Sequence, residues 1–350
     1  MKQLVLLAGL LAGIGLTIQA QAQSSESKPQ TKVSTKGGLS VTSGQYQFKF
    51  GGRIMYDYNK AEKNGVTDED DFDLRRGRLY ASGKIGDDWS FKSQFNVNGG
   101  GAEDLYLRYG GFGSAANITV GRQKMPFGLE ELTSSKDISV LERSAITERF
   151  AIGRSDGVQL HGKMSGNQTY AVAFFTDDVN DAEAGEETGF AARYTIAPYK
   201  TENSLIHLGI AYKDIDEDSA VGLEVAATSG PFHIQAEFVD GEEGNTDLDG
   251  YYIQAGYILT GETRPYSGGK FKRVKPGDKG GAWEVVARLE EGDGNHSDIE
   301  LGRTDASAYT LGLNWYPHGN VRLGVNYTDG EDNLDGDEGN EFRVRFQLTF

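Results

Sequence analysis

The last ten residues of the chain, EFRVRFQLTF (residues 341–350), alternate between polar and apolar side chains without a break. Successive side chains of a β-strand point to opposite faces. The stretch therefore predicts a strand with one polar face, which carries Arg343 and Arg345, and one apolar face. The apolar face comprises Phe342, Val344, Phe346, Leu348 and Phe350. The strand thus ends in an aromatic residue at the carboxyl terminus itself.

The same alternation recurs upstream, in about sixteen short segments from Tyr46 to the end of the chain. Each segment has about 8 to 14 residues, and a tilted strand needs ~9–11 to cross a bilayer. An even number of strands is typical of closed bacterial barrels. The segments lie near residues 46–58, 72–85, 88–98, 103–110, 116–123, 156–164, 168–177, 187–197, 204–213, 219–229, 231–240, 249–260, 281–290, 307–316, 320–329 and 340–350.

A soluble β-sandwich would show the same alternation, so other features must decide between the two folds. Tyr, Phe and Trp gather at the strand ends, as in the aromatic girdles of outer-membrane barrels. Short turns also alternate with long acidic loops, although the connection at residues 261–280 is long on the short-turn side. That exception indicates either a miscounted strand or a turn folded into the pore. We expect an all-β fold, a transmembrane antiparallel β-barrel of about sixteen strands.

The amino terminus has the pattern of a cleaved export signal. Lys2 precedes an apolar run at residues 4–16, and Ala20-Gln21-Ala22 fits a small-residue cleavage site. The run is too short for a spanning helix of ~20 residues. We therefore expect a signal peptide over residues 1–22, a linker over 23–44 and a barrel over 45–350, in the outer membrane of a Gram-negative bacterium. With no cysteine, the chain has no disulfide or thiolate site.

Charge is distributed unevenly along the predicted barrel. The chain has 35 basic and 52 acidic residues, and the net charge of −17 argues against nucleic acid as a partner. The acids concentrate in predicted outer loops such as 68–71, 177–187, 214–218, 240–249 and 329–341. The polar faces of the strands instead carry mostly bases: Lys49, Arg53, Arg76, Arg78, Lys84, Lys92, Arg108, Arg193, Lys213, Arg288, Arg322, Arg343 and Arg345.

Such a basic pore wall favours small anions, because guanidinium groups offer paired donors to phosphate or carboxylate oxygens. The alternative is a structural lattice of salt bridges between these bases and acids folded into the barrel. The longest connection, from the strand end at residue 121 to about Phe150, is neither very acidic nor very rich in glycine. We expect it to fold inward as a constriction loop, and an ordinary surface loop is the alternative.

At these motifs the chain resembles the phosphate-selective porin O and P family. The matching stretches are FGGR (50–53), LRRGR (74–78), GR (121–122), PFGLE (126–130), TSSK (133–136), ERS (142–144), LTGET (259–263), GAWE (281–284) and LNWY (313–316). The resemblance implies a sixteen-stranded homotrimer whose third outer loop narrows each pore. It also implies a long periplasmic turn, residues 264–279, that tucks inward.

Carried over by motif, Arg75 and Arg76 resemble the family's paired pore arginines, and Ser134, Ser135 and Arg143 its constriction-loop ligands. Arg53 is a weaker match, and Arg78 and Lys136 belong to the same motifs. Two positions depart from the pattern, because Glu131 stands where a lysine is expected and Asn96 where an acid is expected. A carboxylate at the narrowest point would repel phosphate and lower its affinity.

The sequence thus predicts passive diffusion of small inorganic anions, phosphate or polyphosphate-like, with outer-membrane lipid and lipopolysaccharide as surroundings. A general or carboxylate-type solute porin is the alternative on the same scaffold, and a structural or adhesive barrel is the runner-up of another class. The five histidines lie in no recognisable nucleophile or metal motif, so no enzyme, metal site or cofactor is expected. No phosphate-binding loop for nucleotides is present, so transport would run downhill.

Overall fold

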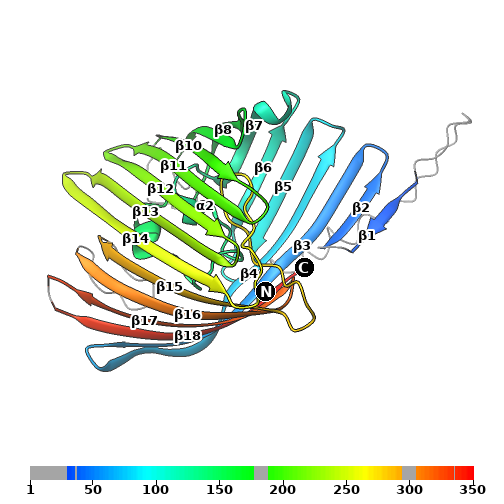
Figure 1. Cartoon of the computed structure of the whole chain (residues 1–350). Helices are drawn as coiled ribbons and strands as arrows, with labels where there is room; N and C mark the ends of the chain where they lie inside the picture. The colour runs from blue at the N-terminus through cyan, green and yellow to red at the C-terminus, as the bar shows by residue number, and fades with distance from the viewer. Residues whose placement is uncertain (1–29, 36–37, 177–187, 294–304, 335) are drawn as a thin grey trace, which may run out of the picture.

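The computed structural model describes residues 30–35, 38–176, 188–293, 305–334 and 336–350. Sixteen strands within these residues form a barrel wall (Figure 1). They are β3 (Tyr46–Lys63), β4 (Val66–Ile85), β5 (Trp89–Asn96), β6 (Ala102–Tyr109), β7 (Asn117–Lys124), β8 (Arg154–Lys163), β9 (Gln168–Thr176), β10 (Thr188–Lys200), β11 (Ser204–Ile215), β12 (Asp218–Ser229), β13 (Phe232–Glu243), β14 (Thr246–Ile258), β15 (Ala282–Gly292), β16 (Ala306–His318), β17 (Val321–Asp332) and β18 (Glu338–Thr349). Each predicted segment corresponds to one of them.

The wall closes on itself. Consecutive strands pair antiparallel from β3 through to β18, and β18 pairs back with β3, with Phe346 opposite Tyr56. Closure satisfies the backbone hydrogen-bonding groups inside a bilayer, where water cannot. The predicted fold class, an antiparallel barrel of about sixteen strands, is confirmed.

The alternation seen in the C-terminal sequence separates the two faces of the wall. On β18, Phe342 and Phe346 are exposed on the outer face, whereas Arg343 and Arg345 are buried inside the barrel. Aromatic pairs such as Trp283 and Trp315, stacked with ring centroids 5.5 Å apart, lie on the outer face. Within the described residues, no helix is both long and apolar enough to span a membrane.

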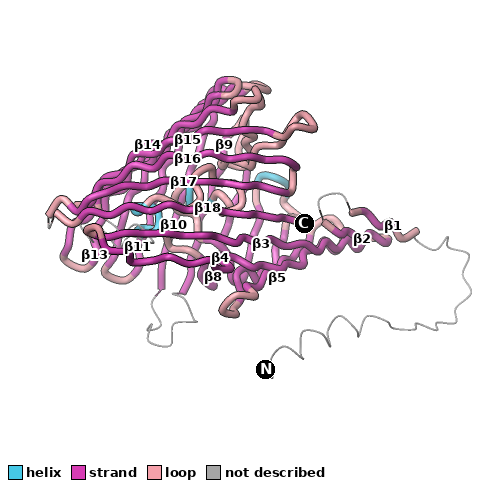
Figure 2. Tube along the Cα trace, turned by 90° about the horizontal axis from the view of Figure 1, so that it is seen from below, coloured by secondary structure: helices cyan, strands magenta, loops and turns pink. Residues whose placement is uncertain are grey.

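Two short strands lie in the predicted linker. β1 (Lys32–Ser34) pairs with β2 (Leu39–Ser43), and β2 pairs with the first residues of β3. β18 ends opposite Arg53, and β2 pairs with the part of β3 that precedes this residue. The hairpin of β1 and β2 therefore extends beyond that end of the barrel (Figure 2). The predicted signal peptide, residues 1–22, lies outside the described residues, and the domain boundaries stay predictions.

Several predicted acidic loops are instead the ends of long hairpins. Residues 68–71 belong to β4, which continues to a tight turn at Asn64 and Gly65. Both turn residues have positive φ, 52° and 75°, as tight hairpin turns require. The loop prediction was wrong here because polar residues on both faces remove the alternation while backbone pairing continues. Residues 177–187 lie outside the described residues.

The long connection after β7 lies inside the barrel. It contains two short helices, α2 (Leu129–Leu132) and α3 (Ala145–Phe150). Phe127 and Phe150 are 2% and 1% exposed and pack against the inner side of β13 and β14, through Val239 and Tyr252. Burial of these large apolar side chains stabilises the inward position. We call residues 125–153 the inner loop.

The long connection between β14 and β15 also turns inward. Arg264 donates hydrogen bonds to the Gln235 side chain and the Asp137 carbonyl, and it stacks 4.4 Å from the centroid of the Phe271 ring. Phe271 is fully buried beside Leu129 of the inner loop. Of the two explanations that the sequence left open, the structure shows the inward-folded turn.

Candidate pore site

Two cavities meet inside the barrel, between the inner loop and the wall from β3 to β10. The cavity toward the long-loop side, here the outer cavity, has about 270 Å³. The inner cavity, toward the short-turn side, has about 590 Å³. Four side chains line both cavities and so mark their junction: Arg53, Lys124, Ser134 and Arg154.

Arg53 of β3 reaches from the wall to the inner loop. Its Nη1 donates to Ser135 Oγ at 2.7 Å and to Ser134 Oγ at 3.3 Å. Lys124 instead contacts the carboxylate of Glu131. Within the described residues, Arg53 is therefore the junction cation that contacts hydroxyls rather than a carboxylate. The structure brings together three of the predicted ligands, Arg53, Ser134 and Ser135.

Arg75 and Arg76 both contact the inner loop although they are neighbours in sequence. In the register of β3 with β4, Met55 faces Arg76 and Asp57 faces Asp73, so β4 contains one extra residue there. Such a β-bulge re-aims side chains that strict alternation would separate. Arg75 Nη2 lies 3.1 Å from Glu142 Oε2, and Arg76 Nη1 lies 2.7 Å from Glu142 Oε1.

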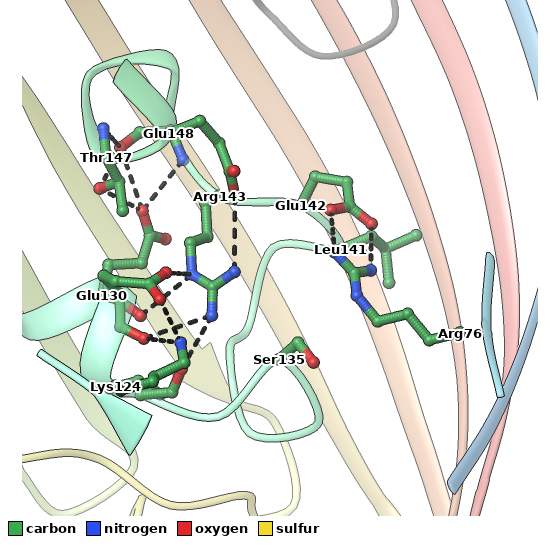
Figure 3. Close-up of polar contacts among 12 residues, drawn as sticks. Arg76, Lys124, Glu130, Ser135, Leu141, Glu142, Arg143, Thr147 and Glu148 are labelled. Atoms are coloured by element: carbon green, nitrogen blue, oxygen red, sulfur yellow. Dashed lines mark hydrogen bonds and ion pairs between the residues drawn. The ribbon is translucent and has the colours of Figure 1, made fainter. Parts of the chain in front are cut away.

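Glu142 anchors the middle of the inner loop to the wall, as Figure 3 shows for its pair with Arg76. Its carboxylate also contacts Arg343 at 3.1 Å and Arg345. Burial alone would raise the pKa of Glu142, but Arg76 and Arg345 outweigh it and hold the pKa well below its usual range. Arg75 and Arg76 line the outer cavity, yet their guanidinium groups are already paired with this carboxylate.

Glu131 lines the outer cavity and lies between two cations, Lys124 and Arg143. Its Oε1 is 2.5 Å from Lys124 Nζ and its Oε2 is 3.0 Å from Arg143 Nε. Burial would raise the pKa of the Glu131 carboxyl, but these two cations hold it below its usual range. The carboxylate is thus charged and neutralised locally. Arg143 also donates to the carbonyls of Glu130 and Thr133, so it holds the inner loop together.

Of the three remaining predicted positions, Arg78 and Asn96 line the outer cavity and Lys136 does not. Asn96 lines the outer cavity and stands opposite Arg78 in the β4–β5 register. Lys136 instead lines a third cavity of about 760 Å³ at the short-turn end, together with Lys49 and Arg273. The structure therefore does not place Lys136 at the junction.

The basic residues of the polar strand faces divide between two roles. Arg288, Arg322 and Arg345 are fully buried and hold the inner loop, with Arg322 Nη1 donating to the Ile138 carbonyl at 2.7 Å. Arg288 on β15 and Arg345 on β18 also pair with carboxylates, as in the salt-bridge lattice that the sequence offered as the alternative, whereas Arg322 on β17 donates to carbonyls and to Asn314. On the opposite side of the barrel, seven basic and two acidic side chains of the described residues line the outer cavity. Eight basic side chains and one acidic side chain line the inner cavity.

Sequence reasoning missed Lys124, Arg154, Glu103 and Asp104. Arg154 begins β8 and contacts both acids, which are adjacent on β6. The signal was present as two consecutive charged residues at the start of a strand, but alternation assigns only one of them to the pore. These residues contribute cations to the junction and carboxylates beside it.

The model of the family described as phosphate-selective porin O and P matches residues 48–218 and 213–350. The chain belongs to this family. A relative, Porin O of Pseudomonas aeruginosa, is 30% identical, over 91% of this chain and 92% of its own. The protein is accordingly an anion-selective porin of the Gram-negative outer membrane.

Solved porins share the fold at low sequence identity. The anion-selective porin from Comamonas acidovorans superposes with a TM-score of 0.61 at 12% identity, covering 87% of this chain and all of its own. Pseudomonas putida OprB gives 0.62 at 9% identity, covering 87% and 94%. These likenesses support the barrel.

Proposed function

We propose that this porin carries phosphate-like inorganic anions by passive diffusion, and that Arg53, Ser134 and Ser135 form its central anion-binding site. The observation that carries the proposal concerns Arg53. This cation at the junction is largely buried, and the described side chains that it contacts are the hydroxyls of Ser134 and Ser135. A guanidinium presents several donors suited to tetrahedral oxyanions. The serine hydroxyls can rotate to donate to the same anion.

The rest of the junction supports this reading through charge. Lys124 and Arg154 line the same place, and both are partly compensated by carboxylates. The fixed positive charge beyond that compensation repels cations and attracts anions. Partial compensation suits transport, because an anion must bind firmly enough to enter and weakly enough to leave.

A general or carboxylate-type porin is the competing function, and two observations favour it. The inner cavity, at about 590 Å³, has room for organic solutes and is lined in part by Tyr106 and Leu132. The pairing of Glu131 with Lys124 and Arg143 also uses two cations that would otherwise bind phosphate.

The assembly and environment of the barrel are proposed by analogy with the family and with solved porins. We propose a homotrimer in contact with lipid and lipopolysaccharide, exported with removal of residues 1–22. The trimer form of OmpT of Vibrio cholerae, which resembles this chain with a TM-score of 0.53 at 13% identity, supports that assembly by analogy.

Planar-bilayer recording of the purified protein tests the function. A potassium chloride gradient should give an anion-selective reversal potential, and added phosphate should block the chloride current. A cation-selective reversal potential would overturn the proposal. Anion selectivity without block by millimolar phosphate would favour the general porin.

A further inference from the structure

Beside the junction, five charged side chains alternate in sign along the barrel wall. The order is Arg78, Glu103, Arg154, Asp104 and Lys92, contributed by β4, β6, β8, β6 and β5. We call this set the charge chain. Its members line the outer or inner cavity or pair with residues that do.

A β-bulge makes the charge chain possible. In the pairing of β5 with β6, Gln94 faces Asp104 and Phe95 faces Ala102, so Glu103 is an extra residue on β6. Strict alternation would send one of two neighbouring carboxylates toward lipid. The bulge instead leaves both nearly buried, with side chains 13% and 8% exposed and directed to lumen cations. β-bulges commonly re-aim side chains in this way near functional sites.

Each of the four carboxylate oxygens has one cationic partner. Glu103 Oε1 is 2.5 Å from Arg78 Nη2, and Glu103 Oε2 is 2.8 Å from Arg154 Nη1. Asp104 Oδ1 is 2.8 Å from Arg154 Nε, while Asp104 Oδ2 contacts Lys92 Nζ. Three cations are thereby reduced to a net charge of about one along this wall, where opposite charges within ~4 Å largely cancel.

We propose that the Glu103–Asp104 pair is a specificity determinant of the pore, which weakens anion binding along the wall next to Arg53 so that bound anions are released quickly. This inference rests on the proposed function. The pair leaves the cations in place but cancels most of their positive potential, so among the described residues Arg53 keeps the strong anion site at the junction. A purely structural role, in which the carboxylates only position Arg78 and Arg154, makes the opposite prediction.

The test uses Glu103→Gln, Asp104→Asn and the double variant, which keep side-chain shape and remove charge. Glu62→Gln, an acid at the outer end of β3, is the matched charge control. One unit charge at ~8 Å, partly screened, should change phosphate affinity about 3- to 10-fold. We expect each single variant to lower the half-blocking phosphate concentration by that factor, the double variant to lower it further, and the phosphate off-rate in current noise to fall. Chloride selectivity should rise in parallel.

Unchanged or weaker block in correctly folded variants would overturn the inference, and weaker block would assign the pair a structural role. Heat-dependent mobility in detergent gels confirms folding, and Glu103→Asp, which retains the charge, should behave as the natural protein does. Failure of the proposed function is seen separately, because the unaltered protein would then show no phosphate block at all.

Discussion

Replacing Arg53 by glutamine should weaken phosphate binding more than any other single neutralisation at the junction. The substitution removes a cation whose Nη1 contacts two hydroxyls, while the inner loop keeps its anchors at Glu142. Hydrogen bonds to a charged group contribute about 1.5–3 kcal/mol. Since ~1.4 kcal/mol corresponds to tenfold in affinity, the half-blocking phosphate concentration should rise about 10- to 100-fold.

The assay is phosphate block of single-channel chloride current at fixed ionic strength. Arg53→Lys should show an intermediate loss, because it keeps the charge and gives up the planar set of donors. Lys60→Gln removes a charge from the same strand, at an exposed outward position, and should leave block unchanged. A change of less than about twofold in Arg53→Gln would refute the assignment, since it is far below a charge-assisted hydrogen bond.

Three further predictions concern the two inward-folded segments. Burial, with Lys272 and Arg193 nearby, lowers the pKa of Lys270 to about 8. Chloride selectivity should therefore fall between pH 7 and pH 9, because this lysine loses its proton in that range. Lys270→Arg should abolish the change. Glu142→Gln removes the carboxylate that buried Arg76 contacts and one of the two that Arg345 contacts, so the free energy of unfolding in urea should fall by about 3–5 kcal/mol; an unchanged midpoint would contradict this anchor. Glu131→Lys should lower the half-blocking phosphate concentration but also lower the urea midpoint, because it places three cations together; weaker block would show that Glu131 does not oppose anions.

The strands could be predicted because one physical rule governs them all. Lipid outside and water inside impose a period of two on every crossing, as in residues 341–350. The rule fails where both faces are wet, and β3 and β4 therefore extend past their predicted ends to the turn at Asn64. The sequence thus predicted that each strand exists, but it did not predict how far a strand continues beyond the bilayer.

The contacts of the pore were harder to predict from the sequence than the strands, because they join residues far apart in the chain. Arg345 Nε donates to Asp57 Oδ1 at 2.7 Å across 288 residues. The family resemblance singled out Arg53, Ser134 and Ser135 separately, and the structure shows that Arg53 donates to both serine hydroxyls. No pattern in the sequence, however, tells which arginines bind the inner loop and which line a cavity. That division depends on where the inner loop rests, which packing of Phe127 and Phe150 decides.

The β-bulges on β4 and β6 show why the charge of the pore wall could not be predicted from the residue type at each single position. At Asn96 the chain lacks the acid that the family resemblance implies, and the loss of that acid alone would make the wall more basic. In the structure Asn96 stands opposite Arg78, yet Arg78 contacts a carboxylate from the next strand, Glu103. One inserted residue on β6 thus returns a negative charge to the wall, as one inserted residue on β4 turns Arg75 and Arg76 to the same side. The charge of the pore wall in this barrel is therefore set by strand register as well as by residue identity. A comparison of sequences at aligned positions detects the residue identities but not the register.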